Sequence, residues 1–77
     1  MPAPRRALNP FLLRRVRRSG KPQRVLAIVA GYTHPNALYT ALHAHRVRAT
    51  AQAVARLERV ADAVGFPKDE LFLDGGR

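Results

Sequence analysis

Residues 23–47, QRVLAIVAGYTHPNALYTALHAHRV, predict two short helices joined by a tight turn. The first run is apolar and ends at Gly31, a residue type that readily adopts the positive φ on which helices often terminate. Thr33 or His34 can cap the second run, and Pro35 suits its first turn, where an N–H has no partner within the helix. A break of three or four residues between short helices is typical of a helix-turn-helix. The segment therefore predicts a DNA-binding unit.

Further helical segments flank this unit on both sides. An Asn-Pro pair and a Ser-Gly pair bracket a helix within residues 9–20. Thr50 caps a longer helix over residues 51–64, whose apolar residues recur at spacings of three and four, and Gly65 ends it. Residues 67–72 read as a last short helix. Because no segment shows convincing strand alternation, we expect an all-α fold, a compact bundle of about five short helices with a helix-turn-helix at helices 2 and 3.

The predicted core uses one face of each helix, and the helix expected to face DNA spans about residues 35–45. Residues 1–8 hold two prolines, two arginines and no periodicity, which indicates a flexible basic arm, while residues 9–74 form the domain and residues 75–77 a tail. The side chains expected to be buried are Leu12, Leu13, Val16, Val25, Leu26, Val29, Leu38, Ala41, Leu42, His45, Val54, Leu57, Val60, Ala61, Val64, Phe66, Leu71 and Phe72.

Composition limits the class of protein. The chain has 77 residues, enough for one domain with a small core, and its 47% apolar content argues against wholesale disorder. It has no cysteine, which excludes a disulfide scaffold and a thiolate zinc site. No apolar run approaches the roughly 20 residues needed to span a bilayer. We expect a cytoplasmic protein with no membrane segment.

The charge of +9 is unevenly distributed along the chain. Residues 1–50 carry ten basic side chains and no acidic one, whereas residues 51–77 carry four basic and five acidic side chains. Such asymmetry favours a polyanion bound by one face, and its coincidence with a helix-turn-helix favours nucleic acid over a merely solvated basic surface. The expected partner is double-stranded DNA, which would associate the protein with the nucleoid.

Two stretches carry a resemblance to a known family: residues 23–31, QRVLAIVAG, and residues 57–72, LERVADAVGFPKDELF. The chain resembles the lambda-repressor-like helix-turn-helix domains of Cro, phage repressors and the xenobiotic-response-element family over about residues 9–74. The resemblance implies that the third helix enters the major groove, that a homodimer binds a palindromic operator, and that the protein regulates transcription as a repressor. Some members of the family are antitoxins instead. The resemblance also implies that Gln23 contacts a phosphate.

One of the side chains predicted to face the groove on the third helix is well suited to recognising a base. Asn36 offers a donor and an acceptor to an adenine edge, although an Asn after Pro is equally often a cap or turn residue. Tyr39 is suited equally to a place in the core, to a phosphate contact and to a base contact. The complete set of predicted base contacts is Asn36, Ala37, Tyr39, Thr40 and His43, and the predicted phosphate contacts are Lys21, Gln23, Arg24, Thr33, His34, Arg46 and Arg48.

Other functions are weighed against this reading. Three histidines without nearby cysteine or acidic groups do not predict a metal site, and we expect no cofactor. The first fifty residues have no acid, no Gly-rich phosphate loop and no Ser/Cys–His pattern, so we expect no enzyme. An antitoxin or protein-interaction subunit of the same fold, or a basic RNA-binding protein, stays open; for RNA, only Tyr32 and Tyr39 offer stacking surfaces.

Overall fold

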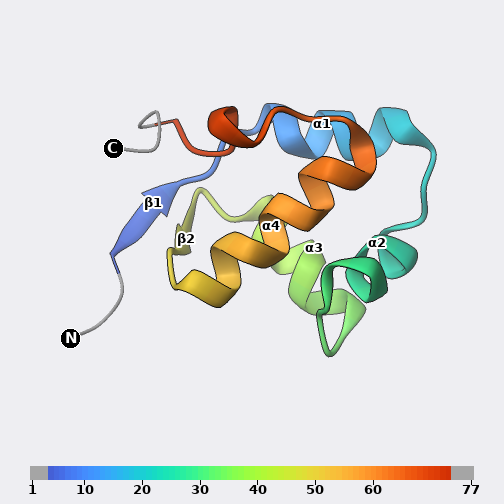
Figure 1. The fold of residues 1–77 in the computed structure, drawn as a ribbon, viewed down its shortest axis with the longest axis horizontal. Coiled ribbons are helices and arrows are strands. Elements are labelled where there is room, and N and C mark those ends of the chain that lie inside the picture. Colours follow the sequence, from blue (N-terminus) through green and yellow to red (C-terminus); the bar gives the residue numbers. More distant parts are fainter. Residues whose placement is uncertain (1–3, 74–77) are drawn as a thin grey trace.

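The protein is mostly helical, with a small sheet at one end. The computed structural model describes residues 4–73. In chain order the elements are β1 (Arg5–Ala7), α1 (Phe11–Ser19), α2 (Gln23–Ala30), α3 (Pro35–His43), β2 (Arg46–Arg48), α4 (Ala51–Val64) and the 3₁₀-helix η1 (Lys68–Glu70) (Figure 1). α4 packs against α1 and α2, and α3 packs against the same two helices. The strands lie at the end of the molecule away from α2 (Figure 1).

The two strands correct the prediction of an all-α fold. β1 and β2 pair antiparallel, with Arg5 opposite Arg48 and Ala7 opposite Arg46. The prediction of a flexible arm over residues 1–8 is therefore wrong for residues 5–8. The Leu8 side chain is only 5% exposed and its N–H donates to the His45 carbonyl at 3.2 Å. Residues 1–3 and the predicted tail at 75–77 lie outside the described residues.

The helix boundaries follow the predicted capping signals closely. Pro35 occupies the first turn of α3, Gly31 ends α2 at φ 90°, and the Thr50 hydroxyl accepts from the Ala53 N–H at 3.1 Å to start α4. α3 ends at His43 rather than at residue 45, because Ala44 is already extended and leads into β2. His45, predicted to face inward, is exposed for the same reason.

Asn9 ties both ends of the domain together at the start of α1. Its Oδ1 accepts from the Phe11 N–H at 3.0 Å, which satisfies one of the unpaired donors of the first turn. Its Nδ2 donates to the Glu70 carbonyl at 2.8 Å. One side chain thus caps α1 and fixes the segment around η1 against it.

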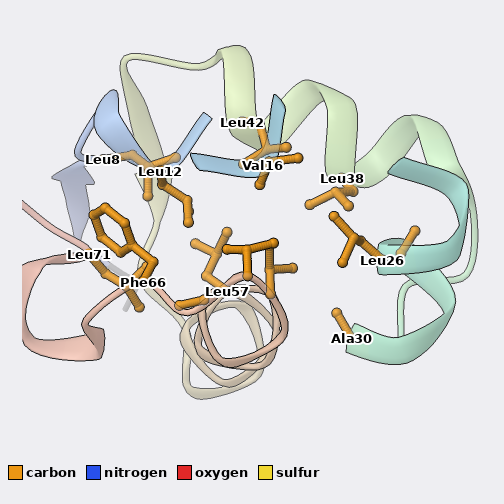
Figure 2. Close-up of a cluster of buried hydrophobic side chains, with 14 of the residues drawn as sticks. Leu8, Leu12, Val16, Leu26, Ala30, Leu38, Leu42, Leu57, Phe66 and Leu71 are labelled. Carbon is orange, nitrogen blue, oxygen red and sulfur yellow. The ribbon is translucent and has the colours of Figure 1, made fainter. Parts of the chain in front are cut away.

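The core gathers leucines from every helix around α4. Leu12, Leu26, Leu38, Leu57 and Leu71 are each at most 1% exposed, and Figure 2 shows them converging on the α4 side chains. Each such burial contributes about 1.5–3 kcal/mol. These five were predicted to be buried, and so were Phe66 and Phe72 from the C-terminal segment, which are buried as well.

The buried face of α2 differs from the prediction. Val25 and Val29 were expected inside but are 45% and 58% exposed, whereas Ala27 and Ala30 are buried with Leu26. Residues 25–30 are all apolar, so periodicity cannot select a face, and the small alanines allow α2 to approach α4 closely. Arg59 of α4 contributes a bond from its Nη1 to the Ala30 carbonyl at 3.1 Å.

Candidate nucleic-acid interface

α3 presents a polar outer face opposite its buried leucines. Leu38 and Leu42, one turn apart, point into the core. All five predicted base contacts are exposed: Asn36, Ala37, Tyr39, Thr40 and His43. Tyr39 is 53% exposed, so it is not a core residue. The fold therefore brings these five side chains onto one accessible helix surface.

One flank of that surface is fixed by a contact between α3 and α1. The Tyr39 and His43 rings stack with centroids 4.1 Å apart. His43 Nδ1 lies 3.1 Å from the Tyr39 carbonyl, and His43 Nε2 lies 3.5 Å from Arg17 Nη2. The carbonyl can only accept and the guanidinium can only donate, so a neutral ring with its proton on Nδ1 satisfies both contacts. Arg17 thereby stands beside α3 on the α1 side.

The other flank of α3 borders two hollows. A shallow one is formed by residues of the turn and the start of α3, His34, Pro35 and Asn36, together with Ala37 and Thr40. The second, about 320 Å³ in volume, is shared by α3, β1, β2 and the first half of α4. We call it the arginine groove after four of its lining residues: Arg5, Arg46, Arg48 and Arg56. Ala37 and Thr40 line both hollows, so the surface is continuous across α3.

Six of the seven predicted phosphate contacts fall into three groups. Thr33 and His34 are exposed in the turn before α3, and Arg46 and Arg48 are exposed on β2. At the start of α2, Arg24 is exposed and Gln23 is half-buried. Lys21 is used elsewhere, because its Nζ donates to the Ala63 carbonyl near the end of α4 at 2.6 Å. The Lys21 ammonium therefore donates a hydrogen bond to one of the last carbonyls of α4, while the residue is also exposed to solvent.

Three arginines of this surface were not predicted from the sequence: Arg5, Arg17 and Arg56. Arg5 was assigned to a flexible arm, the arginines of the first helix were expected to point outward, where phosphates could be met, and Arg56 was given no role. A usable signal was present in β2, where Arg46 and Arg48 are two residues apart, the spacing that places side chains on the same face of a strand. Such a pattern in a three-residue segment is too short to predict a strand on its own.

Tyr32 adds a neutral donor to the arginine groove. It is half-buried, lines the groove, and its ring centroid lies 5.6 Å from Arg56 Cζ. Burial raises the pKa of the Tyr32 hydroxyl above its usual value, with the Arg56 charge acting in the opposite direction. The phenol consequently keeps its proton at neutral pH and can donate a hydrogen bond.

Within residues 4–73, no three His, Asp or Glu side chains gather as they would around a metal ion. None of the helices there is long and apolar enough to cross a membrane. Comparison with protein-family models, with curated proteins and with solved structures found no match to this chain. What the protein binds is therefore inferred from α3 and the basic side chains around it.

Proposed function

We propose that this protein is a sequence-specific double-stranded DNA-binding module, a repressor-like regulator of lambda-repressor-like type that reads the major groove with α3. The observation that carries the proposal is the polar face of α3 with arginines on both flanks: Arg17 from α1 on one side, Arg46 and Arg48 from β2 on the other. A major groove about 12 Å wide admits one helix, and a phosphate backbone runs along each of its edges. The arrangement matches a helix in the groove with a guanidinium for each backbone.

The side chains at the centre of this face suit base recognition. Asn36 can pair with an adenine edge through one donor and one acceptor, Ala37 can pack on a thymine methyl, and Thr40 can form a single hydrogen bond. Tyr39 and His43 are stacked on each other toward α1, which suits contact with the sugar–phosphate edge rather than with the centre of the groove. Base recognition is therefore assigned mainly to Asn36 and Thr40.

The proposal is tested by selecting bound sequences from a random duplex pool and then measuring two variants. Asn36→Ala and Thr40→Ala should each weaken the selected site by about 1–3 kcal/mol while leaving random duplex nearly unchanged. Gln52→Ala is a matched control, since Gln52 is an exposed polar residue of α4 that lines neither hollow. Equal losses on selected and random duplex for Asn36→Ala would show that α3 does not read the sequence.

Tight specific binding should need two chains on one duplex. A single module reads few bases, so we expect a homodimer on half-sites about one helical turn apart, with two chains per duplex by sedimentation. We expect the dimer surface in residues 66–77 with the end of α4; within its described part, up to residue 73, Phe66, Leu71 and Phe72 are buried in the protomer and Leu73 is 61% exposed. A single chain bound to a duplex carrying two half-sites would contradict the dimer.

A protein-interaction subunit, such as an antitoxin, is the second candidate function. It is favoured by an apolar patch on α2, where Val25, Ile28 and Val29 are 45%, 74% and 58% exposed. Three exposed aliphatic side chains on adjacent turns are more than scattered surface residues. Selection from random duplexes that recovers no consensus would favour this candidate over the DNA module.

A further inference from the structure

The arginine groove owes its geometry to the pairing of the two strands. Arg5 lies directly opposite Arg48, and Arg46 lies two residues before Arg48 on the same strand. Side chains at paired positions, and at alternate positions along a strand, project from the same face of a sheet. Arg56, in the second turn of α4, lines the same groove. Segments far apart in the sequence thus bring four arginines to the lining of one groove.

Nothing that lines the groove among residues 4–73 neutralises this concentration of charge. No acidic side chain is among the described residues that line it. Like charges directly opposite each other across a sheet are destabilising, and arginine cannot relieve the repulsion by losing its proton. A bound anion would remove that repulsion. The charge arrangement therefore favours a ligand over a purely structural role.

The donors around the groove select the kind of anion. Arginine presents a planar fork that matches phosphate oxygens in a bidentate contact. The Thr40 hydroxyl and the protonated Tyr32 hydroxyl add neutral donors, while small alanines from α3 and α4 keep the walls open. A volume of about 320 Å³ is at the lower end for ligand sites, suitable for phosphate groups rather than for a large organic molecule.

We propose that the arginine groove is a phosphate-binding site and that, in the complex with DNA, it holds a backbone phosphate beside the bases that α3 reads. The second part rests on the proposed function. Because Ala37 and Thr40 line both this groove and the hollow at the start of α3, a backbone beside α3 would pass its mouth. The N-terminal strand is then part of the binding site, since it supplies Arg5.

The first experiment compares two double variants that each remove two positive charges, R5A/R48A in the groove and R15A/R18A outside it. Arg15 and Arg18 are exposed on α1 and lie near Val64, at the other end of α4 from the groove. On random duplex near 0.1 M salt, R5A/R48A should bind roughly 10- to 100-fold more weakly, with a log–log salt slope reduced by about two. R15A/R18A should retain the wild-type slope. Equal slopes for the two double variants would overturn the DNA part of the proposal.

The second experiment probes the groove without DNA, by titrating the full chain with tripolyphosphate and following backbone amides by NMR. Shifts should concentrate on residues 5–8 and 46–49 in the wild type and in R15A/R18A, and should be lost in R5A/R48A. If the wild type failed to bind duplex yet gave this pattern, the proposed function would fail while the groove would stand as a site for a free phosphorylated ligand. If both double variants behaved alike with duplex and with tripolyphosphate, the groove would not be a phosphate site.

A third variant separates the loss of groove charge from the loss of the sheet, which R5A/R48A can also cause. Arg56→Ala removes a groove guanidinium from α4 without touching either strand, and alanine is a good helix former. It should reduce the salt slope by about one and weaken the tripolyphosphate shifts. If Arg56→Ala kept wild-type behaviour with both ligands while R5A/R48A had lost its sheet, the proposal would be overturned.

Discussion

Raising the salt concentration from 50 to 200 mM is expected to weaken binding of this protein to any duplex by about 10³-fold or more. Each phosphate neutralised by an arginine or lysine releases condensed counterions, which gives a log–log slope of about −0.9 per contact. In the proposed dimer, two chains that each present Arg17, Arg46 and Arg48 beside α3 would supply the roughly six contacts that such a loss requires. The measurement is duplex affinity by fluorescence anisotropy across a salt series.

The ratio of affinities for selected and random duplex is the internal control in that series. Base contacts release few counterions, so the ratio should change far less than either affinity. A flat salt response across this range would contradict the assignment of the basic face to phosphates. The +9 charge would then be a solvated surface, the alternative considered from the composition.

Helix positions were predictable because their ends carry local signals. Gly31 and Gly65 end α2 and α4 with positive φ, and the Thr50 hydroxyl caps α4. These signals depend only on neighbouring residues. The helix-turn-helix order of α2 and α3 followed from them, and so did the exposure of Asn36 and Thr40, because α3 has a clear apolar stripe.

The strands were not predictable because their pairing is non-local. β1 and β2 have three residues each, lie on opposite sides of three helices in the sequence, and are rich in arginine, a residue that signals no strand. The arginine groove was missed with them, because it exists only when Arg5 is paired with Arg48. The exposed face of α2 was not predicted for another reason: a run of uniformly apolar residues has no periodicity that would select the buried face.

Leu8→Ala is expected to destabilise the fold by about 2–5 kcal/mol, although the sequence placed Leu8 in a flexible arm. Its side chain is 5% exposed within the core cluster. The backbone at this point is also hydrogen-bonded, from the Leu8 N–H to the His45 carbonyl and from the Asn9 N–H to the Leu71 carbonyl. The total stability of a 77-residue domain is only about 4–11 kcal/mol. Circular dichroism should therefore show a melting temperature lower by at least about 10 °C.

Leu73→Ala provides the matched control for this prediction. It makes the same substitution on a side chain that is 61% exposed, and it preserves the bond from the Leu73 N–H to the Ala7 carbonyl. Its effect should stay within about 0.5 kcal/mol. Equally small effects for both variants would mean that residues 5–8 do not dock on the core in solution. Arg5 would then not be held opposite Arg48, and the arginine groove would lose the strand that builds it.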